Sequence, residues 1–412
     1  MIDVIIVGAG PAGLSAANVC AKNGLKVKVI DEFMKAGGRL LGQLHEEPDG
    51  TWWNGMEEAK KLNDEAQQLK VEVECGVSVY NIKKLNKSWK VYTTIGDFQT
   101  KALLLATGAA EIPIPIPGWT LPGVMSIGAA QVMTNVHRVK VGNRGIIVGI
   151  NILSSAISRE LQLAGIEVSS MYLPGINIAN GDHGNPLITM RSMLKAASLA
   201  PSKFIRFGSK LMKYEFLHSL ALKFYPKGGM KVWGIPVHLR KAVIEIVGDK
   251  QVEGVRVAHV DMKGEPILSS EEFVPADFVC IAGGLYPLVE LAAITGCPFQ
   301  YVSELGGHVP VHSEKMKTPL EGLYVAGNIT GIENAKIAMN QGTVAGYSVV
   351  QDLINKKEMI EVQLKQAMKA VEHTRDQATI QFHSDIRNGR KKVYMSFKDK
   401  GLIMKKRNFY GE

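Results

Sequence analysis

The chain has 412 residues, of which 46% are hydrophobic, and a formal net charge of +9. A chain of this length can hold two or three domains with packed cores. None of its apolar runs approaches the roughly 20 residues that a membrane-spanning helix needs, and we expect no signal peptide before the first apolar run. We therefore expect a cytoplasmic protein without a membrane span.

Basic residues gather near the C-terminus. No nucleic-acid-binding signature accompanies them, so we expect no nucleic-acid partner. We interpret them as a solvated tail or as a surface that docks an acidic partner protein. They are Arg387, Arg390, Lys391, Lys392, Lys398, Lys400, Lys405, Lys406 and Arg407.

The four cysteines are scattered, without a C-x-x-C pair or another metal-ligand spacing. We therefore expect no metal site on this chain. Cys20 and Cys280 lie in a helical and an apolar segment and are expected in the core. No cysteine pair follows Gly37 and Gly38, where a flavin-dependent disulfide reductase would carry its redox thiols.

The N-terminus has the pattern of a dinucleotide-binding unit. A buried strand over 4–7 leads into the motif GAGPAG at 8–13, a helix is expected over 14–21, and a second strand over 27–30. Strand, glycine turn, helix and strand follow one another at the spacing that this unit requires. The glycine motif is therefore interpreted as a cofactor-binding turn.

Each position of the motif has a physical role. Gly8 permits the tight turn out of the strand, Gly10 lets the backbone approach a pyrophosphate, and Gly13 lets the helix pack on the sheet. Pro11 and Ala12 open the helix, whose free N–H groups and positive dipole end attract phosphates.

Further candidate cofactor contacts follow the second strand. Asp31 or Glu32 stands where a ribose hydroxyl needs an acceptor. Gly38 and Arg39 belong to a segment whose glycine pair lets the backbone pass close to a cofactor. Val79, at the end of the next expected strand, is a further candidate contact.

A third strand end adds small residues. The apolar run 103–105 ends in Ala106, Thr107 and Gly108, where the chain can turn sharply beside the cofactor. Residues 111–123 are rich in Pro and Gly and predict an extended connection between domains.

A second nucleotide-binding unit starts at 145–149, but its fingerprint is damaged. Counting from Gly149, the second and third glycine positions hold Asn151 and Ser154. The same spacing puts Tyr172 at the ribose position, where it cannot accept as a carboxylate does. This unit is therefore not a standard NAD(P)H site. A phosphate still fits at its helix start, so a second adenine nucleotide (ATP, ADP or NAD) stays open.

The last cofactor element is a strand over 323–326 that stops at Gly327. Asn328 follows where flavoproteins of this layout usually carry an aspartate that accepts from the ribityl chain. The helix over 337–350, which opens near Ala335, could point its positive end at the flavin and stabilise the reduced form. Three polar residues before this helix could also touch the flavin ring: Glu333, Asn334 and Lys336.

The rest of the sequence predicts further strands and helices, which mostly alternate along the chain. We expect strands over 71–79, 89–94, 243–247, 252–257, 272–274 and 278–281, helices over 57–69, 154–164 and 285–293, and a helical insertion with a partner-facing surface over 180–207.

The predicted fold class is α/β, with two Rossmann-like dinucleotide-binding domains in a glutathione-reductase-like arrangement. The FAD-binding domain is expected to be discontinuous, with its first part at 1–115 and its second at 286–352. A nucleotide-binding domain of the NAD(P) type, with the damaged fingerprint, is inserted at 116–285. A helical and basic tail over 353–412 completes the chain.

Three segments resemble one family of flavoproteins: GAGPAG near the start, ATGAAEIPIPIPGWTLPGVMSIGAAQ in the middle, and TPLEGLYVAGNITGIENAKIAMNQGTVAG near the end. They resemble the FAD-containing alpha subunits of multi-subunit amine and imino-acid dehydrogenases, namely opine oxidase, hydrogen cyanide synthase, hydroxyproline dehydrogenase and dye-linked proline dehydrogenase. The likeness covers roughly residues 1–350, and PGWTLPGV is its most specific piece.

The resemblance implies FAD and two kinds of partner: a second flavoprotein subunit of the amino-acid-oxidase type, and a small iron-sulfur subunit in some complexes. It also implies that Gly8, Gly10 and Gly13 contact the pyrophosphate and that Gly327 and Asn328 contact the ribityl-phosphate. The chain departs from the family in its damaged second fingerprint, in Asn328, and in lacking a C-terminal cysteine-rich module.

We therefore predict an FAD-dependent oxidoreductase subunit of a hetero-oligomer that oxidises a secondary amine or amino acid, such as proline, hydroxyproline, sarcosine or an opine. Such a complex could lie at the inner membrane face. A self-sufficient NAD(P)H-dependent flavin reductase and a non-catalytic assembly subunit holding a structural nucleotide are the alternatives. The catalytic acid or base is unknown, and His137, His308 and His312 are weak candidates only.

Overall fold

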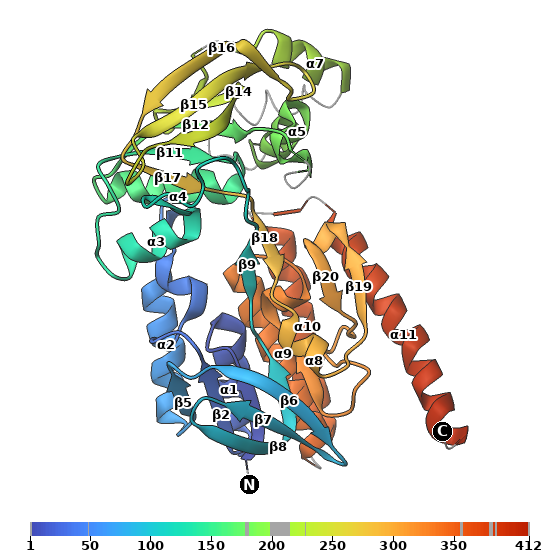
Figure 1. The fold of residues 1–412 in the computed structure, drawn as a ribbon. Helices are drawn as coiled ribbons and strands as arrows, with labels where there is room; N and C mark the ends of the chain where they lie inside the picture. The colour runs from blue at the N-terminus through green and yellow to red at the C-terminus, as the bar shows by residue number, and fades with distance from the viewer. Residues whose placement is uncertain are drawn as a thin grey trace. The chain divides into compact units, whose positions relative to one another are not determined.

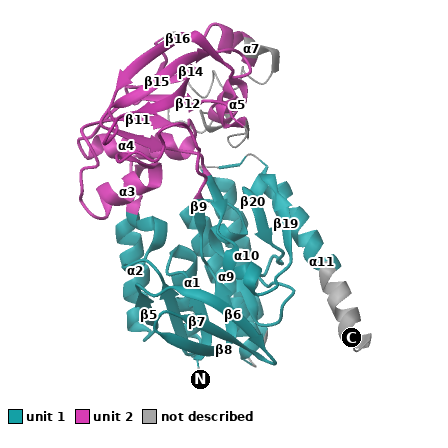
Figure 2. Cartoon of the chain, viewed as in Figure 1, with its two compact units in different colours: residues 1–41, 54–110, 285–412 teal, residues 42–53, 111–284 magenta. Residues whose placement is uncertain are grey.

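A computed structural model describes residues 2–47, 49–177, 181–197, 215–226, 228–354, 357–378, 382–383 and 385–410. The chain divides into two compact units (Figure 2). Unit 1 comprises Met1–Leu41, Asn54–Ala110 and Leu285–Glu412, and unit 2 comprises Gly42–Trp53 and Glu111–Gly284. The division follows contacts within the chain, and the domain boundaries drawn from the sequence stay a prediction.

Unit 1 is built on a sheet that has seven strands within the described residues (Figure 1). The order is β5-β2-β1-β8-β7-β6, and β21 also pairs with β8. The strands β5, β2, β1, β8 and β21 run parallel, whereas β6 and β7 form an antiparallel extension. Their bounds are β1 Ile2–Val7, β2 Val27–Asp31, β5 Glu72–Cys75, β6 Val79–Leu85, β7 Ser88–Thr93, β8 Gly96–Leu105 and β21 Leu323–Val325.

Both faces of this sheet are covered, which explains the continuous apolar runs of its strands. Val4 and Ile6 of β1 face a core shared with the helices, while Ile5 faces a second core that includes Trp89. The helices of unit 1 are α1 Pro11–Lys22, α2 Gly55–Gln68, α8 Glu290–Ile294, α9 Ala335–Leu353, α10 Lys357–Gln377 and α11 Ile386–Tyr410. Its short elements include β18 Leu285–Pro287, β19 Phe299–Val302, β20 Gly307–Pro310, η3 Ser303–Leu305 and η4 Gly327–Thr330.

Unit 2 has its own sheet, which has eight strands within the described residues, in the order β10-β17-β11-β12-β14-β15-β16 with β13 beside β14. Its strands are β10 Val124–Ser126, β11 Arg144–Val148, β12 Glu167–Pro174, β13 Met230–Val232, β14 Ile235–Val247, β15 Gly254–Val260, β16 Pro266–Pro275 and β17 Phe278–Ile281. Its helices are α3 Ile127–Asn135, α4 Ile152–Leu163, α5 Pro186–Ala197 and α7 Glu215–Lys223. Short segments at or near the unit boundaries are η1 Gly38–Gly42, β3 Leu44–Glu46, β4 Trp52–Asn54 and β9 Ala109–Glu111, and η2 Gly181–Gly184 follows β12.

Three expected elements differ in the structure. The single strand expected over 71–79 is two strands, β5 and β6, separated by a turn at Gly76. The helix expected over 285–293 is the strand β18 followed by the short helix α8, because Pro287 cannot donate an N–H within a helix. Of the helical insertion expected over 180–207, the structure describes 181–197, and the remainder lies outside the described residues.

Within the described part of the chain, no helix combines the length and the apolar character needed to cross a membrane.

The helices α1 and α9 pack with their backbones in close approach (Figure 1). A Cβ atom added at Gly342 of α9 would lie 2.1 Å from the carbonyl oxygen of Ala12 in α1. The two helices can therefore keep this separation only with glycine at position 342.

We expect Gly342→Ala to lower the free energy of unfolding by about 2 kcal/mol, because forcing atoms into a packed contact costs about 1–3 kcal/mol. Thermal unfolding followed by circular dichroism measures the change. The matched control is Gly228→Ala, because a Cβ there meets nothing within 4 Å. Equal unfolding temperatures for both variants would contradict the close packing of α1 and α9.

Candidate cofactor site

The carboxyl ends of four parallel strands meet at one edge of the sheet in unit 1. Val7 of β1 pairs with Ile30 of β2 and Leu105 of β8, and Val325 of β21 pairs with Leu105. The four strands therefore end side by side. In open α/β sheets this edge is where ligands bind, and the predicted cofactor residues follow these strands.

The turn after β1 needs glycine for two reasons. Gly8 has φ +107°, and a Cβ there would lie 2.3 Å from the carbonyl oxygen of Ala106. A Cβ at Gly13 would lie 1.8 Å from the carbonyl oxygen of Gly8. The backbones of Gly8, Gly13 and Ala106 therefore lie so close together that a side chain at Gly8 or Gly13 would clash.

Gly10 and Gly38 also face each other. Gly38 has φ +54°, and a Cβ there would lie 3.0 Å from the Cα of Gly10. Gly10 is the N-cap of α1, and no side chain caps this helix, which starts at Pro11. The first N–H groups of α1 therefore remain available to an anion, as a pyrophosphate requires.

Of the two acids at the end of β2, Asp31 lies at the glycine turn. Its Oδ2 accepts the Ala9 N–H at 2.5 Å, and its Oδ1 accepts the Phe33 N–H at 2.8 Å. Burial raises the pKa of the Asp31 carboxyl, and these two hydrogen bonds oppose the shift. Glu32 is exposed. The structure therefore favours Asp31 as the ribose acceptor.

Two other predicted residues have protein partners. The Arg39 guanidinium donates to the carbonyl oxygen of Ala109 at 3.1 Å. Val79 lies within β6 opposite Thr93. Asp31 pairs with Cys75 of β5, and the Val77 N–H donates to the Asp31 carbonyl at 3.0 Å. The sequence pattern does not single out Val77, because 71–79 resembles one continuous strand.

Thr107 and Gly108 hold the segment after β18. The Thr107 hydroxyl donates to the Leu288 carbonyl at 2.6 Å, and the Leu288 N–H donates to the Gly108 carbonyl at 3.1 Å. These two residues therefore shape the edge of the site from the end of β8.

Gly327 and Asn328 reach the same edge from the end of β21. A Cβ at Gly327 would lie 2.8 Å from the Cβ of Ala12, so the turn lies directly against the start of α1. The Asn328 Oδ1 accepts the Glu333 N–H at 3.2 Å. Helix α9 begins at Ala335.

The residue that fastens this turn, Gln341 of α9, carries no signal in the sequence. Its side chain accepts the Gly327 N–H at 2.9 Å and donates to Glu333 Oε2 at 3.1 Å. Glu333 in turn pairs with Arg375 and Arg390. Arg390 is 2% exposed, so its interpretation as part of a solvated or docking tail is wrong. Arg390 is buried because its guanidinium forms an ion pair with the Glu333 carboxylate in the interior of unit 1.

In unit 2 the corresponding turn keeps its first glycine but not its open helix start. A Cβ at Gly149 would lie 2.2 Å from the Ala282 carbonyl oxygen. Asn151 and Ser154 form a reciprocal capping box at α4, with both hydrogen bonds at 2.9 Å. The Asn151 Nδ2 also donates to the Ala282 carbonyl at 2.8 Å. Side chains thus occupy the turn that is bare in unit 1.

The predicted ribose position at Tyr172 is wrong by one residue. The Gly8 N–H donates to Ile30, and the equivalent Gly149 N–H donates to Tyr172. The equivalent of Asp31 is therefore Leu173, which is fully buried. The shift arises where the pairing of β11 and β12 is irregular between Gly145 and Ile146. An apolar residue at this position offers no acceptor to a ribose.

Glu160 of α4 is a buried carboxylate within unit 2. It accepts hydrogen bonds from Gln131 at 2.8 Å, Asn135 at 2.8 Å and the Leu44 N–H at 3.2 Å. Burial raises the pKa of Glu160 to about 7, against the effect of these donors.

Cys20 and Cys280, two of the four cysteines, are buried thiols. Burial raises the pKa of Cys20 to about 12 and also raises that of Cys280, whereas the reactive species of a cysteine is the thiolate. Among the described residues, the four cysteines form no disulfide bond. Among the described residues, no group of three His, Cys, Asp or Glu side chains could hold a metal ion.

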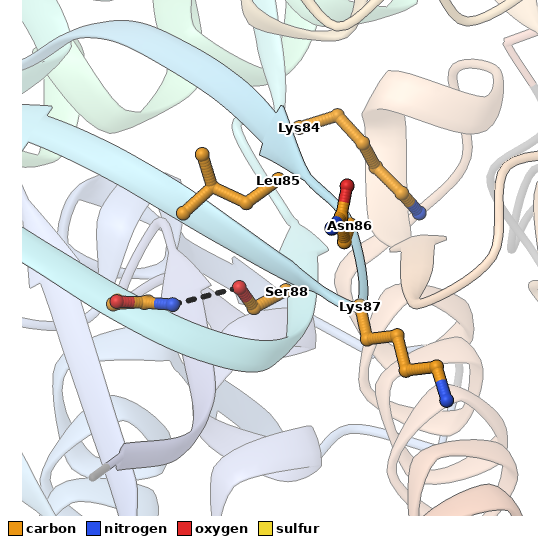
Figure 3. Close-up of a pocket in the computed structure, with 6 residues that line it drawn as sticks. Lys84, Leu85, Asn86, Lys87 and Ser88 are labelled. Atoms are coloured by element: carbon orange, nitrogen blue, oxygen red, sulfur yellow. Dashed lines mark hydrogen bonds between the residues drawn. The ribbon is translucent and has the colours of Figure 1, made fainter.

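An open hollow lies at the β6–β7 hairpin (Figure 3). Its lining belongs to none of the strand ends described above, and the Gln99 amide donates to the Ser88 hydroxyl across it at 2.8 Å. The hollow is lined by Lys84, Leu85, Asn86, Lys87, Ser88 and Gln99.

Residues 2–172 match the model of the family described as pyridine nucleotide-disulphide oxidoreductase. The chain is 27% identical over 363 residues to one subunit of the opine oxidase of Agrobacterium tumefaciens, an alignment that covers 85% of this chain and 66% of the relative. It is 25% identical to hydrogen cyanide synthase subunit HcnB of Pseudomonas aeruginosa, covering 84% of this chain and 70% of the relative. The chain is therefore similar in sequence to a subunit of an opine oxidase and to a subunit of a hydrogen cyanide synthase. The resemblance inferred from the sequence is confirmed, and the chain spans about two thirds of these relatives' length.

Solved structures agree in fold. L-proline dehydrogenase from P. horikoshii matches with a TM-score of 0.61 at 18% identity, over 89% of this chain and 58% of that chain. Thioredoxin reductase from T. acidophilum matches with a TM-score of 0.60 at 23% identity, over 85% of this chain and 98% of that chain. The predicted α/β fold with Rossmann-like dinucleotide-binding units is confirmed, and the family match and the similar relatives support the predicted FAD cofactor and oxidoreductase class.

We expect Asp31→Asn to weaken FAD binding about 10-fold or more, because hydrogen bonds to a charged group contribute about 1.5–3 kcal/mol. Fluorescence titration of the apoprotein with FAD measures the dissociation constant. Glu32→Gln is the matched control and should bind FAD as the wild type does. A larger loss in Glu32→Gln than in Asp31→Asn would assign the ribose to Glu32 instead.

Glu160 predicts a pH dependence of stability. Because its folded-state pKa, about 7, lies above the ordinary value of 4.5, the folded chain holds this proton more tightly than the unfolded chain between these two values. The free energy of unfolding of the wild type should therefore fall from about pH 4.5 to about pH 7, relative to Glu160→Gln, and the difference should then level off. Urea unfolding at several pH values tests this, with the exposed Glu253→Gln as the control. A difference that does not vary with pH would contradict it.

Proposed function

We propose that this chain is the FAD-binding subunit of a hetero-oligomeric dehydrogenase or oxidase that acts on a secondary amine or amino acid. Candidate substrates are proline, hydroxyproline, sarcosine and opines. The partners would be a second flavoprotein of the amino-acid-oxidase type and, in some assemblies, a small iron-sulfur subunit. The names of the relatives support this proposal, because they are subunits of an opine oxidase and of a hydrogen cyanide synthase.

The observation that carries the proposal is the contrast between the two glycine turns. In unit 1 the helix start after Gly10 is bare and Asp31 stands beside it. In unit 2 Asn151 caps its helix and Leu173 replaces the acid. This contrast favours a chain that holds FAD and does not draw its electrons from a nicotinamide, which suits a subunit whose flavin exchanges electrons with a partner.

The residues of unit 1 fit FAD. The backbones at Gly8, Gly10 and Gly13 with the start of α1 would hold the pyrophosphate, and Asp31 would accept from the adenosine ribose. Gly327 with Asn328 would hold the ribityl-phosphate.

The remaining predicted positions would shape the rest of the cofactor site. Ala106, Thr107 and Gly108 would border the cofactor, and the amino end of α9 at Ala335 would favour negative charge on the flavin. The flavin supplies the hydride and electron chemistry when it is bound, whereas the protein orients it and sets its electrostatics.

The test compares the chain alone with the complex purified from its native source. We expect the native preparation to contain a second flavoprotein and its flavin absorbance to bleach when proline, hydroxyproline or sarcosine is added without oxygen. The FAD-loaded chain alone should not bleach with the same amines. A native preparation that holds this chain as its only protein, or fast bleaching of the isolated chain by an amine, would overturn the proposal.

A further inference from the structure

A cluster of three charged side chains is buried in unit 1 behind the Gly327–Asn328 turn. Glu333 is 4% exposed, Arg375 5% and Arg390 2%. Arg375 pairs with both oxygens of the Glu333 carboxylate, at 2.5 and 2.9 Å, and Arg390 pairs with Oε2. Two guanidinium groups share one carboxylate, so the cluster carries one net positive charge.

Both arginines come from the C-terminal helices. Arg375 lies in α10 and Arg390 in α11, whereas Glu333 precedes α9. Arg390 Nη1 also donates to the Thr330 carbonyl at 2.6 Å and to its hydroxyl at 2.8 Å. Arg390 therefore binds one end of the loop between Thr330 and Glu333, at Thr330, which lies 60 positions earlier in the chain. Arg375 binds the other end at Glu333, which lies 42 positions earlier.

The cluster is connected to the cofactor turn by hydrogen bonds. The side chain of Gln341 joins Glu333 Oε2 to the Gly327 N–H, and the Glu333 N–H contacts the Asn328 side chain at 3.2 Å. A displacement of the Glu333 carboxylate therefore reaches both residues of the turn.

The net charge of the cluster depends on the titratable side chains that contact it. Glu372 also pairs with Arg375, but its side chain is 55% exposed, so solvent screens it. His312 lies 3.5 Å from Arg390 Nη1 and is fully buried. Burial, together with the charge of Arg390, lowers the pKa of His312 to about 3, which leaves it neutral. The buried charge therefore remains close to one positive unit.

We propose that Glu333, Arg375 and Arg390 are positioning residues of the flavin site, which hold the Gly327–Asn328 turn and place a net positive charge behind the amino end of α9. This inference rests on the proposed assignment of Gly327 and Asn328 to FAD. A buried charge acts more strongly than an exposed one because less solvent screens it. It adds to the positive end of the helix dipole and favours the negative charge of a reduced flavin.

The test uses the full-length FAD-loaded chain and measures the reduction potential of the bound flavin against reference dyes. Glu333→Gln leaves two positive charges and should raise the potential, whereas Arg390→Gln leaves none and should lower it. Loss of packing alone would not move the potential in opposite directions in the two variants.

Each variant has a matched control on the same elements. Arg387→Gln removes an exposed arginine of α11 that pairs with Asp376, and Glu372→Gln removes the exposed partner of Arg375. Both should leave the potential and the FAD dissociation constant unchanged. Arg390→Lys keeps the charge but not the paired donors, so it should bind FAD several-fold more weakly than the wild type at nearly the wild-type potential.

Potentials that shift in the same direction in Glu333→Gln and Arg390→Gln, or that do not shift, would overturn the inference. The same holds if Arg390→Lys moves the potential as far as Arg390→Gln. A wild-type chain that binds no FAD would instead overturn the proposed function. The two failures are therefore distinguishable.

Discussion

The close approach of backbones around the start of α1 is the constraint on which the rest of unit 1 depends. The carbonyl oxygen of Gly8 occupies the space that a side chain at Gly13 would need, and that of Ala106 does the same at Gly8. The start of α1 also approaches α9, where the Ala12 carbonyl lies against Gly342. These contacts hold two strand ends and two helices close enough for one dinucleotide to touch all of them.

Unit 2 has the same turn but not the same chemistry. Gly149 makes the approach to Ala282 that Gly8 makes to Ala106. The polar groups of the turn are satisfied by Asn151 and Ser154 within the chain, and the buried Leu173 fills the position that Asp31 has in unit 1. A scaffold can keep its shape while the groups that recognise a ligand are replaced, so function has to be argued from the site and not from the fold.

Local sequence patterns predict much of the fold and of the candidate cofactor site in unit 1. The turn around Gly8, the strand end before Thr107 and the turn at Gly327 are each defined by residues close in the chain, so their spacing was sufficient. Leu173 could not be predicted by counting, because the pairing of β11 and β12 shifts within the strand. Arg390 could not be predicted either, because its partner Glu333 is 57 residues away and charge in a sequence usually indicates solvent.

The central claim is that the flavin in unit 1 receives no electrons from a nicotinamide bound to unit 2. Anaerobic titration of the FAD-loaded chain with NADH, followed at the visible flavin band, tests it most directly. Our account predicts that the band persists with excess NADH and bleaches with dithionite, which shows that the flavin is competent. Stoichiometric bleaching by NADH would contradict the account, because it would mean that unit 2 binds a nicotinamide despite Asn151 and Leu173.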